Sequence, residues 1–180
     1  MEITVIKAGG AGDRDRVWMG EGGTARRVAV HVVHDLPHLA VESAFGITDG
    51  LWGELAAGRH AEADRAAGAR DSRRQKQGRI VSGAAAKVPT AEWLTDGHRR
   101  AKSVTNWVTN HWGDGPDTPQ GVRDRAARGQ DQVAAELLDR FGDEAIARAI
   151  AEVRDLLHRW ADVPPGGTLR LTWPLVGTGE

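Results

Sequence analysis

The sequence predicts an α+β fold in which a small antiparallel sheet, built from N- and C-terminal strands, packs against a mainly helical middle. Three observations support this prediction. Short β-rich runs alternate with glycine turns over residues 3–33, a pattern typical of antiparallel strands. Apolar residues recur at helical spacing over much of 35–161. A last alternating run at 168–173 needs a partner strand for its backbone groups.

Three strands are expected near the N-terminus. Residues 3–7 form the first, and a glycine-rich turn leads to a short strand at 16–19. A second glycine turn precedes the third strand, expected at 27–33. The last strand, at 168–173, follows a Pro-Pro-Gly-Gly break, and we expect it to pair with a strand near the N-terminus.

The first two helices carry the residues of greatest functional interest. We expect Asp35 to cap a helix that runs to about Ala44. Pro37 then falls in the first turn, where its missing N–H costs nothing. A second, short helix is expected to begin after Asp49 and to end at Gly58.

Three more helices are expected in the second half of the chain. Thr90 caps the first of them, which ends at a Gly-Asp-Gly-Pro stop at 113–116. The cap-then-proline pair at 118–119 starts a helix that runs to Phe141, and the last helix spans 144–161.

Length and composition predict one domain over residues 1–180. The absence of cysteine excludes disulfides, thiolate catalysis and cysteine-based zinc sites. The formal net charge of −1 gives no overall basic field, so nucleic acid is not an expected partner. No apolar run is long enough to span a bilayer, and the N-terminus does not resemble a signal peptide; a cytoplasmic location is therefore expected.

Residues 59–89 lose periodicity, and we expect a mobile loop there. Its first part, 59–79, carries seven basic residues against three acids and could contact phosphates. It lacks the interleaved aromatic residues of single-strand binders, which favours a solvated loop. Next to a pocket, the loop would serve as a lid over an anionic substrate.

The candidate functional centre is the segment 34–38, His-Asp-Leu-Pro-His. On a helix, His34 and His38 lie one turn apart on one face, with Cβ atoms about 5–6 Å apart, which suits one divalent ion. Zinc proteases use the same spacing with a Glu as general base; Asp35, one methylene shorter, makes a peptidase a poor candidate. The structural alternative is a histidine pair packed on the sheet, with Asp35 as a helix cap.

Two histidines rarely complete a metal site, so a carboxylate is needed. Glu42 continues the four-residue series, but it lies about 12 Å of helical rise from His34, too far for one ion to reach both. Glu54, on the next helix, can fold back toward the histidines and is the better third ligand. Asp35 is a possible fourth.

The motif at 34–38, followed by the Gly-Glu pair that ends at Glu54, resembles the coenzyme Q biosynthesis protein 4 family. That family has a His-Asp-x-x-His helix and a Glu on the next helix, which together bind zinc. The resemblance implies that His34, Asp35, His38 and Glu54 are the ligands. It also implies chemistry at a quinone-precursor ring carbon that bears a carboxylate. The family is helical, whereas strands are expected here at both ends.

His98 and His111, on the Trp-rich helix, are further candidates. They lie about 140° apart around a helix axis and therefore cannot share one ion on that helix. Either could face the His38 site as a general acid or base, because imidazole titrates near neutrality. His111 is preferred, since it lies at the most polar and aromatic helix end in the chain.

We therefore expect a small mononuclear metalloenzyme, with zinc as the first choice and ferrous iron or manganese also compatible with these ligands. Glu42 or His111 would move protons, and the substrate would be a small anionic or aromatic metabolite. Ring decarboxylation, ring hydroxylation and hydrolysis all stay open. The alternative is a non-catalytic binding protein with structural histidines and a basic loop that contacts phosphate or RNA. The sequence does not give the oligomeric state.

Overall fold

The sheet joins the two ends of the chain. The structure, a computed structural model, describes residues 1–10, 14–20, 25–28, 31–57, 96–109 and 116–174. Strands β1 (Glu2–Ile6), β2 (Arg16–Met19), β3 (Arg26–Val28) and β4 (Thr168–Thr172) form one sheet in the order β3-β2-β1-β4. Neighbouring strands are all antiparallel. The expected pairing of the last strand with an N-terminal strand is confirmed.

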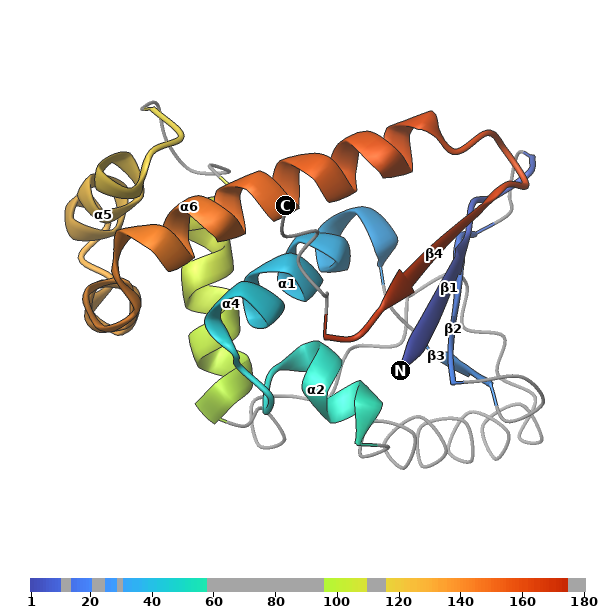
Figure 1. The fold of residues 1–180 in the computed structure, drawn as a ribbon, viewed down its shortest axis with the longest axis horizontal. Helices are drawn as coiled ribbons and strands as arrows, with labels where there is room; N and C mark the ends of the chain where they lie inside the picture. The colour runs from blue at the N-terminus through green and yellow to red at the C-terminus, as the bar shows by residue number, and fades with distance from the viewer. Residues whose placement is uncertain (11–13, 21–24, 29–30, 58–95, 110–115, 175–180) are drawn as a thin grey trace, which may run out of the picture.

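Period-two alternation decides which face of the sheet is buried. Ile3 and Val5 of β1 are fully buried, and their partners on β4, Leu171 and Leu169, are buried with them. The residues between them in sequence point to the opposite face. Helices α1 and α6 lie to one side of the sheet (Figure 1), so the apolar face of each strand closes the core.

Helix α1 (Val32–Phe45) lies at the centre of the helical layer (Figure 1). It packs against α2 (Leu51–Ala56), α4 (Asp96–Val108) and α6 (Gln132–Asp162), while α5 (Pro119–Arg128) packs on α6. The architecture is α+β, as the sequence predicted. Within the described ranges, no helix has both the length and the apolar character needed to cross a membrane.

Two predicted boundaries are wrong. The third strand was expected over 27–33, but Val32 and Val33 belong to the first turn of α1. A run of β-branched residues fits a strand and a buried helix start equally well, and the core contacts of Val32 favour the helix. The helix that Asp35 was expected to cap therefore has its N-cap four residues earlier, at His31, and Pro37 lies inside the helix rather than in its first turn.

The second wrong boundary divides an expected helix. The helix from 118–119 ends at Gly129 instead of reaching Phe141, and α6 starts after Asp131, whose carboxylate accepts a hydrogen bond from the Ala134 N–H at 3.0 Å. The predicted break at Gly142 is confirmed: its φ of 75° and ψ of 176° divide α6 into two helical segments. The expected Thr90 cap, residues 113–115 of the expected stop and the 59–89 loop lie outside the described residues.

Candidate functional site

The first turn of α1 is organised by the Asp35 carboxylate. One oxygen accepts a hydrogen bond from the backbone N–H of His31, the residue before the helix, at 2.6 Å. The other lies 2.7 Å from Nδ1 of His34. Asp35 therefore caps the helix by reaching back from within the first turn to the N–H of the N-cap residue His31, and does not itself occupy the N-cap position that the sequence suggested. The same carboxylate fixes the orientation of the His34 ring.

His34 and His38 stand side by side on successive turns. Their ring centroids are 5.7 Å apart and the rings are tilted by 34°. The two rings differ in environment: the side chain of His34 is 61% exposed, whereas His38 is buried at 4%. The pair therefore combines one imidazole at the surface with one inside the protein.

The environment of His38 favours its neutral form. Its Nδ1 lies 3.4 Å from the hydroxyl of Thr105 on α4. Burial lowers the pKa of His38 to about 4; the Asp35 charge opposes this shift, and the fields of His34, His98 and Lys102 add to it. At neutral pH His38 is an uncharged imidazole, the form that binds metals or accepts a proton.

Helix α4 supplies a polar face next to His38. His98, Lys102 and Thr105 are spaced by four and three residues, so they share one face of the helix, and all three act on His38. His98 was one of two candidates from the sequence; the preferred one, His111, lies outside the described residues. The spacing of the polar residues 98, 102 and 105 in the sequence could have indicated this shared face.

Glu42 was expected to move protons at the histidine site, but its carboxylate is held at the start of α2. Its carboxylate is buried at 0% exposure and accepts hydrogen bonds from the backbone N–H groups of Leu51 at 2.7 Å, Trp52 at 2.9 Å and Gly53 at 3.3 Å. These groups form the N-terminus of α2. Glu42 therefore joins α1 to α2, and both of its oxygens are engaged in that joint.

The pKa of Glu42 reflects opposing influences. Burial raises it to about 8, although the three backbone donors favour the ionised carboxylate. Asp49 raises it further by charge repulsion. Sequence spacing could not have identified this role, because it depends on where α2 folds back against α1.

Helix α2 is tied to the histidine turn by an indole. Trp52 is fully buried, and its Nε1–H donates to the backbone carbonyl of Asp35 at 2.8 Å. Glu54 lies two residues further along and is buried at 8% exposure. The link holds α2 against the helix that carries both histidines, and the role of Glu54 as a ligand stays a prediction.

The four expected ligands do not form a complete metal site in this conformation. Across the described residues, which include all four, no group of three or more His, Asp or Glu side chains is arranged to hold a metal ion. His34, Asp35 and His38 are brought together, but Asp35 is occupied with the His31 N–H and the His34 ring. The metal assignment stays a prediction.

Comparison with known proteins adds no identification. No protein-family model, curated protein or solved structure matches the chain. The resemblance to the coenzyme Q biosynthesis protein 4 family therefore stays a prediction based on the residues of the motif.

Proposed function

We propose that the chain is a metal-dependent enzyme in which His34 and His38 bind one divalent ion, with zinc as the first choice and ferrous iron or manganese as alternatives. The observation that carries the proposal is the pair of imidazoles 5.7 Å apart, one of them held neutral by burial. Both rings make their side-chain contacts through Nδ1, to Asp35 and to Thr105. That arrangement leaves Nε2 of each ring available to bind the metal. Hydrogen-bond partners such as these commonly orient metal-bound histidines.

Glu54 is the proposed third ligand. The Trp52 link to Asp35 supports this choice, since it holds α2 against the histidine turn. Binding would require the Glu54 carboxylate to turn toward the two imidazoles. A bound divalent ion would supply an activated water or a Lewis acid for hydrolysis, ring decarboxylation or ring hydroxylation.

The charge next to His38 supports an anionic substrate. Lys102 is exposed on α4, and its field is felt at His38. An ammonium group there would attract a small carboxylate or phosphate to the exposed side of the pair. We propose His98, on the same face of α4, as the proton carrier in place of Glu42. A cytoplasmic location belongs to this proposal.

The test is metal affinity, measured by equilibrium dialysis and elemental analysis on protein purified without a histidine tag. We expect about one zinc ion per chain, and at least a tenfold weaker affinity in His34→Ala and Glu54→Gln. His34 is exposed, so its replacement should leave the fold intact. His158→Ala is the matched control, since this exposed histidine pairs with Asp162 away from the site. A wild-type chain that binds no zinc, cobalt, iron or manganese, or a His34→Ala variant with unchanged affinity, would overturn the proposal.

A further inference from the structure

The second face of the sheet is not covered by α1 or α6, and it has an unusual composition. Strand register places two arginines, one tryptophan and one threonine in a single row across all four strands. Arg27 of β3 pairs with Trp18 of β2, Trp18 pairs with Thr4 of β1, and Thr4 pairs with Arg170 of β4. We call these four residues the cross-strand row. Their sequence neighbours Val17, Val5 and Leu171 point into the core, so the row points outward.

The spacing of the row follows from sheet geometry. Adjacent strands lie about 4.8 Å apart, so Arg27 and Arg170 are separated by three such steps, or about 14 Å. The half-buried indole of Trp18 lies between them, next to Arg27. A flat aromatic ring with a guanidinium group to each side is thus displayed on one sheet surface.

Among the described residues, the arginines of this face form no ion pair with a carboxylate. Arg16, Arg27 and Arg170 are exposed, and none of them forms an ion pair with a carboxylate among the described residues. Arg16 lies on the same face, opposite Ile6 of β1. Glu2 is the one acidic residue that the described register places there, and it accepts a hydrogen bond from Thr4. The described residues therefore give this face a positive net charge, although the net charge of the whole chain is −1.

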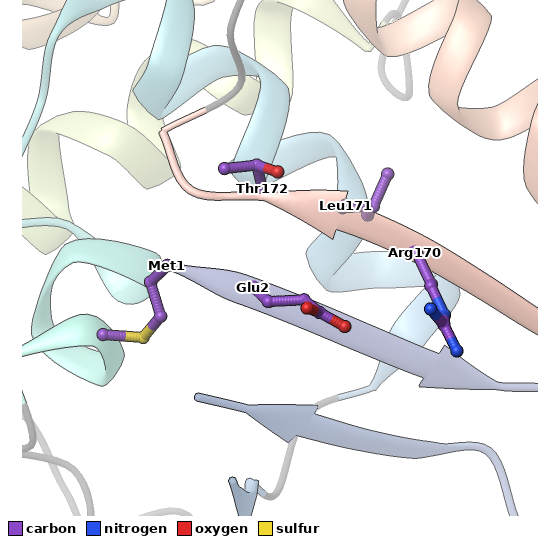
Figure 2. Close-up of a pocket in the computed structure, with 5 residues that line it drawn as sticks. All are labelled: Met1, Glu2, Arg170, Leu171 and Thr172. Carbon is purple, nitrogen blue, oxygen red and sulfur yellow. The ribbon is translucent and has the colours of Figure 1, made fainter. Parts of the chain in front are cut away.

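A shallow hollow adjoins one end of the row. It has a volume of about 330 Å³ and is lined by Met1, Glu2, Arg170, Leu171 and Thr172. Figure 2 shows the Arg170 side chain reaching from β4 across toward β1, where Glu2 lies. The hollow widens the surface beside Arg170 and gives an extended ligand room to continue past the sheet edge.

We infer that this face binds single-stranded nucleic acid, with a base stacked on Trp18 and phosphates held by Arg27 and Arg170. Sequence-tolerant binding of single strands combines positive charge along the backbone path with aromatic rings on which bases stack, and the cross-strand row has both. An acidic peptide would use the arginines but would leave the tryptophan without a function. The row runs across four strands over about 14 Å and does not lie on a helix or a two-stranded ribbon, the elements that enter a groove of duplex DNA. The inference does not depend on the proposed metal site.

The overall charge of −1 suggested that nucleic acid was an unexpected partner. The overall charge sets the field of the whole molecule, whereas a stacking surface acts through the local field at contact distance. The aromatic residue missing from the basic segment at 59–79 is present here, between arginines that lie far apart in the sequence. Only the strand register brings them together.

The test is fluorescence anisotropy with a short fluorescein-labelled oligouridine, measured from about 50 to about 200 mM salt. Trp18→Val should weaken binding about tenfold without changing the salt dependence, because it removes stacking and no charge. Arg27→Gln and Arg170→Gln should each reduce the slope of log affinity against log salt by about 0.7, the value for one phosphate of a single strand. Trp18→Phe keeps an aromatic ring and should retain most of the affinity.

Arg140→Gln, which removes an exposed arginine on α6, is the matched control and should bind like wild type. Three results would each overturn the inference. The wild-type chain could fail to bind oligouridine saturably. The Arg27, Arg170 and Trp18 variants could bind no more weakly than the control. A polyglutamate peptide could compete as well as unlabelled oligouridine, which would identify an acidic protein surface as the partner.

Discussion

At the scale of single residues, helix α1 carries two buried titratable side chains whose pKa values shift in opposite directions. His38 has its pKa lowered to about 4 by burial, so it favours a folded state without the proton. Its contribution to stability is complete above the unfolded pKa of about 6.5 and is lost as pH falls through 4. Glu42 has its pKa raised to about 8, also by burial, so it favours a folded state with the proton. Its contribution is complete below about 4.5 and is lost as pH rises through 8.

The directions of these two pKa shifts predict how the free energy of unfolding depends on pH. Between pH 6.5 and 8 the contribution of His38 is constant and only that of Glu42 falls, so the free energy of unfolding should decrease by about 2 kcal/mol from this group. In Glu42→Gln, which cannot titrate, the decrease should be absent. Urea denaturation of the wild-type protein and the Glu42→Gln variant at several pH values in this window measures the difference in the free energy of unfolding. Parallel wild-type and variant curves would contradict the prediction.

The sequence identified the histidine pair but not the role of Glu42. The spacing of His34 and His38 fixes their relative position as soon as a helix forms, because neighbours four residues apart share a face. The hydrogen bonds of Glu42 depend on Gly50 and on the path of the chain between two helices, which no local pattern specifies. Local geometry is therefore predictable from spacing, and contacts across a turn are not.

At the scale of elements, the junction of α1 and α2 depends on glycines that allow close packing. A Cβ atom on Gly50 would lie 2.4 Å from the carboxyl carbon of Glu42, and one on Gly53 would lie 1.9 Å from the carbonyl oxygen of Thr48. The contact at Gly50 would require the Glu42 carboxylate to move, whereas the contact at Gly53 is with backbone and would require α2 itself to move. The position of α2 therefore depends on the close approach of its backbone at Gly50 and Gly53 as well as on the Trp52 hydrogen bond.

We predict that Gly50→Ala destabilises the protein by about 1–3 kcal/mol, because the added methyl group displaces the Glu42 carboxylate from the N-terminus of α2. Thermal unfolding followed by circular dichroism would measure the loss. Gly46→Asn is the matched control: Gly46 has a φ of 63°, which asparagine tolerates, and its Cβ would meet no atom within 4 Å. Equal stability of the two variants would argue against the close contact.

Helix boundaries were the least predictable feature at this scale. The β-branched run that ends at Val33 fits both a strand and a helix start, and packing of Val32 into the core decides between them. The break after Gly129 was missed because apolar residues at helical spacing continue across it. The stop at Gly142 was predictable, since the positive φ there favours glycine.

At the scale of the whole molecule, the two ends of the chain hold the structure together. The Met1 amino group donates to the Trp173 carbonyl at 2.8 Å, and the Trp173 N–H donates to the Met1 carbonyl at 2.7 Å. The sequence predicted this pairing because an isolated terminal strand cannot satisfy its backbone groups. It could not predict the cross-strand row, because the row exists only once the order β3-β2-β1-β4 is known.

Lys7 connects the sheet to the end of α6 and provides the clearest test of this long-range closure. Its ammonium group donates to the carbonyls of Trp160 at 2.9 Å, Ala161 at 3.2 Å and Val163 at 2.8 Å, and it lies 5.0 Å from the centre of the Trp160 ring. These carbonyls belong to the C-terminal turn of α6, where a positive charge is favoured and orphan acceptors need donors.

We predict that Lys7→Met lowers the free energy of unfolding by about 1–3 kcal/mol, because methionine keeps the apolar stem and leaves three carbonyls without their donor. Lys102→Met, which removes an exposed lysine from α4, should change stability by less than about 0.5 kcal/mol. Urea denaturation at pH 6 separates the two variants, and hydrogen exchange should show faster opening of the last turn of α6 in Lys7→Met alone. Equal stability of the two lysine variants would contradict the prediction. The β1–β4 backbone pairing would then hold the two ends of the chain together and Lys7 would not contribute.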